Sequence, residues 1–213
     1  MATRPVFLPA KRGSYVDTYM TEFVWNKGLA ASQKRKNVAA LHEAFARRFP
    51  QRRILEISSK STEAAGVALS AFNLKKYVPS LGRSIPLECV YHGGKVFAAG
   101  GPYTDLYTAS PKEAKRDPRL RASGALKSFY FEGKMLSAVP STAFYNWLYI
   151  NALMENPELA EALLEYDGFT DIEFNPDKSI NCQARSAALF LNLSRKGALE
   201  RCRDFEEFRA LCA

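Results

Sequence analysis

Hydrophobic side chains recur at helical spacing along much of the chain and predict most of its elements. Apolar positions every three or four residues predict an amphipathic helix that Ser32 caps and that ends near 49, before Pro50. The segment 142–154 is strongly apolar and rich in aromatic residues, and it predicts another helix. Further helices are predicted over 87–98, 110–117, 156–166 and 181–197, and after Asp204.

Segments with the character of strands are shorter. They are predicted at about 52–58, 67–77 and 169–174, with a small hairpin from 127 onward. Residues 1–30 lack clear periodicity, and we expect an arm packed on the domain, with one short strand at 21–25. Without βαβ rhythm or internal repeat, the pattern predicts an α+β fold, mainly helical: a single domain, 31–213, with a small β-sheet.

Composition restricts the class of protein. Of 213 residues, 47% are hydrophobic and 24% charged, as in an ordinary soluble globular protein. No apolar run is long enough to span a bilayer and the first residues lack a signal-peptide core, so we expect a cytoplasmic protein without a membrane partner. Four cysteines without a Cys-x-x-Cys pair, beside two histidines, indicate free thiols, and we expect no metal and no other cofactor.

The net charge of +8 favours a polyanionic partner, such as nucleic acid or a phosphorylated ligand. The alternative is a basic surface that serves solubility alone.

The predicted helix 87–98 carries the most reactive combination of side chains. Glu88, His92 and Lys95 stand at positions i, i+4 and i+7, so on a helix they share one face. A carboxylate, an imidazole and an amine on one stripe can handle protons or attack an electrophilic carbon, although ordinary surface helices also place Glu and Lys this way. The pair Gly93-Gly94 costs a helix roughly 1 kcal/mol per glycine, which a sequence tolerates for close packing or close approach of a ligand.

Two polar loops supply further candidates. Ser58-Ser59-Lys60-Ser61 follows a predicted strand, and its hydroxyls, amine and turn amides can hold a diphosphate or form an ordinary polar loop. The segment 167–183 surrounds another strand with carboxylates and amides, which can supply a general acid, hold a ribose, or serve as caps and turns. His42 lies between apolar helix positions and is expected to be structural. Aromatic rings able to stack on a base, but more often found in a core, are Trp25, Phe72 and Tyr103.

Taken together, these residues resemble the NADAR family. That family shows a Ser-Asn-Phe-like segment, then a helix start with Glu and Lys, and a later Asp near a short strand before an Asn-capped helix. The corresponding residues here are Ser70-Ala71-Phe72-Asn73, Glu88, Lys95, Asp171 and Asn181. Over nearly its whole length the chain is similar to a NADAR branch of antitoxins found beside guanine-specific DNA ADP-ribosyltransferase toxins. The stretches that carry this similarity are Leu55–Ser61, Gly100–Tyr107, Phe144–Asn151 and Phe169–Asn175.

The resemblance implies a catalytic domain over 31–213 with N-glycosidase activity, which removes ADP-ribose from guanine in DNA. Its implied partners are ADP-ribosylated DNA and a cognate toxin. Glu88 would stabilise positive charge on the ribose, Asp171 or a water it orients would protonate the guanine, and Lys95 would be the nucleophile or only an electrostatic clamp. Substrate contacts are expected from Ser58, Ser59, Lys60, Ser70, Phe72, Asn73, His92, Tyr103, Asn181 and Gln183, and DNA phosphate contacts from Lys34, Arg35, Arg47, Arg52 and Lys115.

Three other functions stay open at this point. Some NADAR relatives cleave an N-glycosidic bond in riboflavin-pathway intermediates, which gives a metabolite enzyme as the first alternative. The second is a non-catalytic reader of ADP-ribose or ADP-ribosylated nucleic acid. The third is an antitoxin that acts by direct contact with its toxin.

Overall fold

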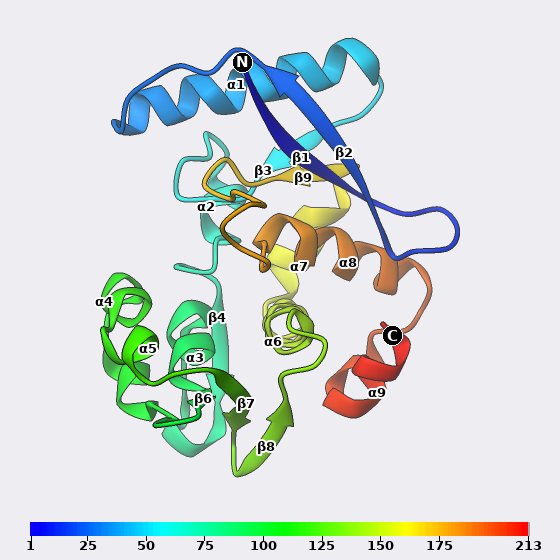
Figure 1. Ribbon diagram of the computed structural model, residues 1–213. Helices are drawn as coiled ribbons and strands as arrows, with labels where there is room; N and C mark the ends of the chain where they lie inside the picture. The colour runs from blue at the N-terminus through cyan, green and yellow to red at the C-terminus, as the bar shows by residue number, and fades with distance from the viewer. Residues whose placement is uncertain (213) are drawn as a thin grey trace. The chain divides into compact units, whose positions relative to one another are not determined.

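The computed structural model describes residues 1–212 (Figure 1). The fold is α+β and rich in helix, as the sequence predicted, with three small sheets rather than one. Contacts divide the chain into two compact units. The first unit comprises 1–70 and 157–199, and the second comprises 71–156 and the described residues from 200 on. Within 1–212, none of the helices combines the length and the apolar character that crossing a membrane requires.

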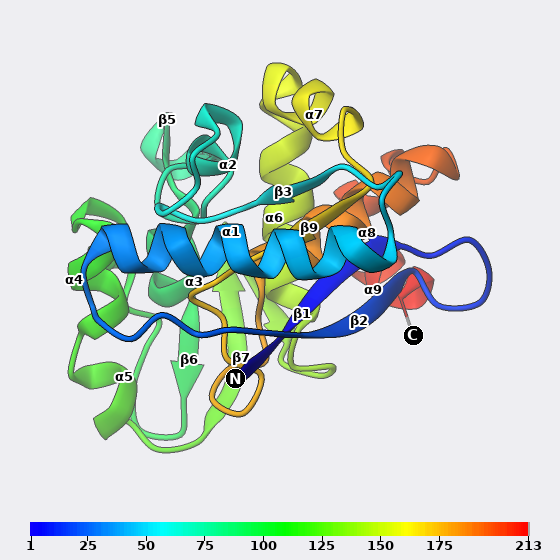
Figure 2. The same cartoon turned by 90° about the horizontal axis from the view of Figure 1, so that it is seen from above.

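The first unit is built on a four-stranded sheet of order β2-β1-β9-β3. Its strands are β1 (Ala2–Pro9), β2 (Val16–Phe23), β3 (Ile54–Glu56) and β9 (Gly168–Thr170). The first two pair antiparallel from Ala2↔Phe23 to Pro9↔Val16, whereas β3 and β9 run parallel. Seen from above, helix α1 (Ala31–Arg48) lies along this sheet (Figure 2). The two share a core of Val6, Leu8, Phe23, Val38, Leu41, Phe45 and Ile172. The remaining helices of this unit are α2 (Ala64–Ala68), α7 (Pro157–Leu164) and α8 (Gln183–Arg195).

The expectation of one short strand at 21–25 in residues 1–30 was wrong, because these residues form the complete β1–β2 hairpin. Strand β1 lies between β2 and β9 in the sheet. Its residues from Pro5 to Pro9 are buried, because Val6 and Leu8 pack on α1 and helix α8 also packs against the strand. A strand buried on both faces shows a continuous apolar run instead of an alternation. Whether residues 1–30 are an arm and 31–213 a catalytic domain stays a prediction.

Three boundaries also differ from expectation. Helix α1 begins at Ala31, with Ala30 as an N-cap that lacks a side-chain bond, so Ser32 lies inside the first turn. Helix α8 has Cys182 rather than Asn181 at its N-cap. The predicted strand 67–77 contains the end of α2, a turn, and only a short strand at its end.

The second unit contains the antiparallel pair β4 (Lys75–Val78) and β5 (Arg83–Pro86), and a three-stranded sheet of order β6-β7-β8. Those three strands are β6 (Lys95–Phe97), β7 (Leu126–Phe131) and β8 (Lys134–Ser137). Its helices are α3 (Leu87–Gly93), α4 (Pro111–Arg116), α5 (Arg119–Ala122), α6 (Ala143–Met154) and α9 (Phe205–Leu211). Short 3-10 helices are η1 (Pro79–Leu81), η2 (Thr104–Thr108) and η3 (Glu200–Arg203).

Helix α6 forms the centre of the second unit. All of its residues except the last are buried, and it packs against α3, β4, η3 and α9. The helix itself was predicted from its apolar sequence, whereas its central place is seen only in the structure. The capping box of Ser110 and Glu113 and the Asp204 cap of α9 are also confirmed, because both make the expected backbone bonds.

Candidate active site

Lys95 lies on a strand and not on the helix that was predicted over 87–98. Helix α3 ends at Gly93, and Lys95 is the first residue of β6. The cause is β-pairing, because the Gly94 carbonyl accepts a 2.6 Å bond from the Tyr130 amide of β7. A Cβ atom at Gly94 would stand 2.6 Å from the Tyr130 carbonyl oxygen. The glycine at this corner therefore allows strand β7 to approach closely and end the helix.

The three predicted side chains nevertheless lie together, although the helix ends before Lys95. Glu88 Oε1 lies 3.3 Å from His92 Nε2, and His92 Nδ1 lies 3.1 Å from Lys95 Nζ. Glu88 and His92 are buried, with 5% and 8% of their surface exposed. The Lys95 amine also lies over the Tyr91 ring, 4.4 Å from its centroid. A carboxylate, an imidazole and an amine thus form one continuous polar chain inside the second unit.

A fourth side chain completes this cluster. The Lys115 amine, on α4, lies 3.1 Å from Glu88 Oε1 and 5.4 Å from the centroid of the Phe72 ring. Its side chain is 58% exposed, so it connects the buried carboxylate to solvent. The sequence suggested Lys115 only as a DNA contact, because nothing in the spacing indicates that α4 packs on α3. We call Glu88, His92, Lys95 and Lys115 the carboxylate–amine cluster.

The electrostatics of the cluster differ from group to group. Burial tends to raise the pKa of Glu88, but the His92 hydrogen bond and the Lys115 charge outweigh it, so the pKa lies below its ordinary value. Burial lowers the pKa of His92 despite the bond to Glu88. Burial also lowers the pKa of Lys95 to about 8; Glu88 opposes this shift and Lys115 adds to it. At neutral pH the cluster therefore holds an ionised carboxylate, a neutral imidazole and an amine that deprotonates easily.

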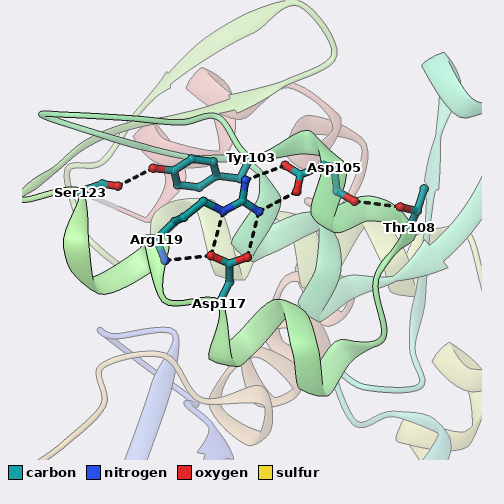
Figure 3. A network of polar contacts seen from close by, with 6 residues as sticks. All are labelled: Tyr103, Asp105, Thr108, Asp117, Arg119 and Ser123. Carbon is teal, nitrogen blue, oxygen red and sulfur yellow. Dashed lines mark hydrogen bonds and ion pairs between the residues drawn. The ribbon is translucent and has the colours of Figure 1, made fainter.

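A second polar network in the second unit surrounds Tyr103, a predicted base-stacking residue (Figure 3). The Arg119 guanidinium lies 4.4 Å from the centre of the Tyr103 ring and binds the carboxylates of Asp105 and Asp117, with N···O distances of 2.6 and 2.9 Å. The Tyr103 hydroxyl bonds Ser123. A stacking base would therefore compete with Arg119 for one face of this ring.

The first unit holds the predicted diphosphate loop. The Ser58 hydroxyl is buried and donates a 2.7 Å bond to Glu56 Oε1. Ser59 is exposed, and its hydroxyl accepts a 2.9 Å bond from the Lys60 amine. The Lys60 backbone amide binds the Ser58 hydroxyl oxygen at 3.1 Å. The loop is therefore anchored through Ser58 and presents Ser59 and Lys60.

The sequence did not single out Glu56, which organises this part of the first unit. Its two carboxylate oxygens accept bonds from Ser58, from the Ile172 amide at 2.8 Å and from the Thr170 hydroxyl at 2.6 Å. The Thr170 hydroxyl in turn lies 2.8 Å from His42 Nε2. Glu56 stands between apolar neighbours in its strand, and its side chain is buried.

Other predicted residues of the first unit lie near these strands. Asp171 is buried directly after β9, and one carboxylate oxygen accepts the Glu173 amide at 3.0 Å. Gln183 donates a 2.7 Å bond to the Ile57 carbonyl, next to the diphosphate loop. Asn181 is half-buried before α8. Ser70 is buried and bonds the Val67 carbonyl. In the second unit, Asn73 is exposed and Phe72 is half-buried under Lys115.

The basic residues predicted to contact DNA in the first unit are mostly paired. Arg47 binds Glu43 at 2.7 Å, Arg52 binds Asp167 at 3.3 Å, and Lys34 lies 3.4 Å from Glu173. Arg35 is exposed and forms no ion pair within the described residues. These four positions stay predictions.

A surface hollow of about 170 Å³ lies between β2 and α1, lined by residues such as Tyr19, Met20 and Arg48. None of the predicted catalytic or substrate-binding residues lines it. Among residues 1–212, His, Cys, Asp and Glu side chains form no group of three or more that could hold a metal ion.

The fold and these contacts define a class: a helix-rich α+β protein with a buried carboxylate–imidazole–amine chain suited to acid–base or covalent chemistry. The family model described as DarT1-associated NADAR antitoxin matches residues 2–213. The chain belongs to this family, which confirms the resemblance found in its sequence. No curated protein matches it. Membership implies an antitoxin role with a cognate DarT toxin, and the NADAR family is associated with N-glycosidase or hydrolase activity.

Proposed function

We propose that this antitoxin is an N-glycosidase that removes ADP-ribose from guanine bases in DNA, and so reverses the modification made by its toxin. The main support is the Lys95 amine, half-buried and in contact with an imidazole and near a carboxylate. A lysine with a pKa of about 8 is roughly one-tenth neutral at pH 7, against less than one part in a thousand for an ordinary lysine. Such an amine is a competent nucleophile.

The proposed reaction breaks the bond between C1″ of the distal ribose and a guanine nitrogen. The Lys95 nitrogen bonds to C1″ while the electron pair of the broken bond leaves with guanine. Positive charge develops on the ribose as this bond breaks, and the ionised Glu88 stabilises it. The resemblance alone assigns Asp171, or a water it orients, as the proton donor to guanine. Water then adds to C1″, releases ADP-ribose and restores the free amine.

Substrate binding is proposed to follow the polar groups that remain available. Ser59, Lys60 and the turn amides next to them are the contacts proposed for the diphosphate, since the Ser58 hydroxyl already binds Glu56. The net charge of +8 supports attraction to DNA phosphates, so binding is expected to weaken steeply with salt.

The decisive experiment incubates the protein with an oligonucleotide that carries ADP-ribose on guanine and follows the oligonucleotide mass. We expect the wild type to remove one ADP-ribose unit, Glu88→Gln to bind without turnover, and Lys95→Ala to be inactive. Lys112→Ala, which removes an exposed lysine from the same helix as Lys115, is the matched control and is expected to keep full activity.

The alternatives give different results in this assay. Binding without loss of mass would indicate a reader, and cleavage of riboflavin-pathway intermediates without action on DNA would indicate a metabolite enzyme. Protection of cells from the toxin by the inactive Lys95→Ala variant would indicate direct contact with the toxin.

A further inference from the structure

We propose that His92 is the proton acceptor for Lys95: its Nδ1 atom takes the proton that the Lys95 nitrogen loses as that nitrogen bonds to an electrophilic carbon. The identity of that carbon, C1″ of ADP-ribose, rests on the proposed function. The proton transfer itself does not, because any electrophilic carbon that reached Lys95 would require it.

The hydrogen bonds fix the direction of this transfer. Glu88 is ionised, so its oxygen can only accept, and His92 Nε2 must donate the proton in their 3.3 Å contact. A neutral imidazole protonated at Nε2 carries a lone pair at Nδ1. That atom faces Lys95 Nζ at 3.1 Å. Glu88 thus selects the tautomer in which His92 presents its basic nitrogen to the amine.

Glu88 favours the state after transfer, although burial and the Lys115 charge keep His92 neutral before it. When His92 becomes an imidazolium, its positive charge lies beside the buried Glu88 carboxylate. The groups around Lys95 are Glu88, His92 and the Tyr91 ring from α3, and Lys115 from α4. On the adjacent strand β7 its register partner is Phe129, which does not titrate. Only His92 among them is a neutral base in contact with the amine.

The transfer balances with the rest of the reaction. Bond formation leaves the Lys95 nitrogen with an additional positive charge and a proton to lose. Removal of that proton restores the nitrogen lone pair. This pair can then form a C=N bond to C1″ while the C1″–O4″ bond of the ring breaks, which gives a protonated imine, and the ring oxygen takes up a proton from solvent. Addition of water to C1″ later reverses these steps, and His92 returns the proton to the departing amine. With both ring nitrogens engaged, His92 has none free for the substrate contact expected from the sequence.

The test measures imine formation at Lys95 without DNA. The full-length protein is treated with glycolaldehyde and cyanoborohydride at pH 7.5, and modification of Lys95 is followed by peptide mass spectrometry, with exposed Lys112 as the internal reference. We expect His92→Ala to lower the rate at Lys95 about 10²-fold. Imidazole is expected to restore it, whereas pyrazole, a ring of the same shape and much lower basicity, is not.

The other histidine provides the matched control. His42→Ala, in the first unit, is expected to leave the Lys95 rate unchanged. His92→Gln is the substitute if His92→Ala folds poorly, because it keeps a polar group at this position without a basic nitrogen. In this variant Lys95 is expected to react as slowly as in His92→Ala.

Equal rates for the wild type and His92→Gln would overturn the proposal, as would equal rescue by imidazole and pyrazole, or an unmodified Lys95 in the wild type. A wild type that shows the expected aldehyde chemistry but removes nothing from ADP-ribosylated DNA would refute the proposed function and leave the role of His92 standing.

Discussion

Among the described residues 1–212, each unit has a buried network that joins a glutamate to a histidine. In the first unit Glu56 accepts bonds from two hydroxyls and a backbone amide, and His42 bonds the Thr170 hydroxyl. In the second unit Glu88 faces an imidazole and an ammonium group, and the chain continues to the Lys95 amine. The same residue types therefore have neutral hydrogen-bond donors around the glutamate in one unit and cationic neighbours in the other.

Because their partners differ, the pKa values of the two glutamates are shifted in opposite directions. Burial raises the pKa of Glu56, the charge of Glu173 adds to this shift, and the neutral donors only partly oppose it. Burial acts on Glu88 as well, but there His92 and Lys115 bring the pKa below its ordinary value. A carboxylate surrounded by neutral donors ties backbone segments together, whereas a carboxylate with cationic neighbours stays ionised and can control the protons around it. We therefore assign a structural role to the first network and a role in the proposed reaction to the second.

The sharpest test of this assignment removes the amine that only the second network contains. We expect Lys95→Ala to lower the rate of ADP-ribose removal by roughly a thousandfold or more. Its free energy of unfolding should not fall, because loss of a half-buried amine removes a desolvated charge. Activity is measured by oligonucleotide mass and stability by urea unfolding. A variant that loses stability and activity together would show that Lys95 is structural.

The converse test removes the glutamate of the first network. Glu56→Leu leaves Ser58, Thr170 and the Ile172 amide without their acceptor, and each buried unpaired group costs about 1–3 kcal/mol. We expect the free energy of unfolding to fall by about 3 kcal/mol, measured by urea titration of circular dichroism. Glu88→Leu should reduce stability less, because Lys115 can turn to solvent. An equal loss in both variants would contradict the division of roles.

The third prediction concerns pH. Capture of Lys95 by an aldehyde requires the neutral amine, whose fraction rises as pH passes the Lys95 pKa of about 8. Between pH 7 and pH 9 the rate should rise roughly tenfold. In Lys115→Met the profile should move to higher pH, because the Lys115 charge lowers the pKa of Lys95. A profile that keeps its midpoint in this variant would remove Lys115 from control of the amine.

The smallest expected effect tests His42. Burial lowers its pKa to about 4, below the value of 6.5 for an exposed histidine. The unfolded chain therefore binds more protons between these two values, so the stability due to neutral His42 is complete above pH 6.5 and is lost as pH falls toward 4. Because the side chain is partly exposed, we expect a loss of about 1 kcal/mol between pH 7 and pH 5. His42→Gln should show a correspondingly weaker pH dependence in urea titrations at the two pH values.

Several elements of the fold were predicted from sequence patterns that span only a few residues. The apolar spacing of α1, the strongly apolar α6, the Ser110 capping box and the Asp204 cap depend on residues close in sequence, and all were predicted. The β1–β2 hairpin was missed because α1 and α8 pack on β1 and cover its faces, so its apolar run does not alternate. The end of α3 was missed because it depends on a hydrogen bond between Gly94 and Tyr130 of β7, which lies more than thirty positions further along the chain.

The candidate site, like the fold, was only partly predictable from the sequence. Residue types and spacing were enough to place Glu88 and His92 on one turn of a helix and to reveal the resemblance to an antitoxin family. Three contacts between distant parts of the chain could be found only in the folded protein: Lys95 reaches His92 from a strand, Lys115 pairs with Glu88, and the buried Glu56 binds Ser58, Thr170 and the Ile172 amide. Long-range packing sets which side chains lose water and which charges become neighbours, and those two quantities fix the protonation states on which the proposed chemistry depends.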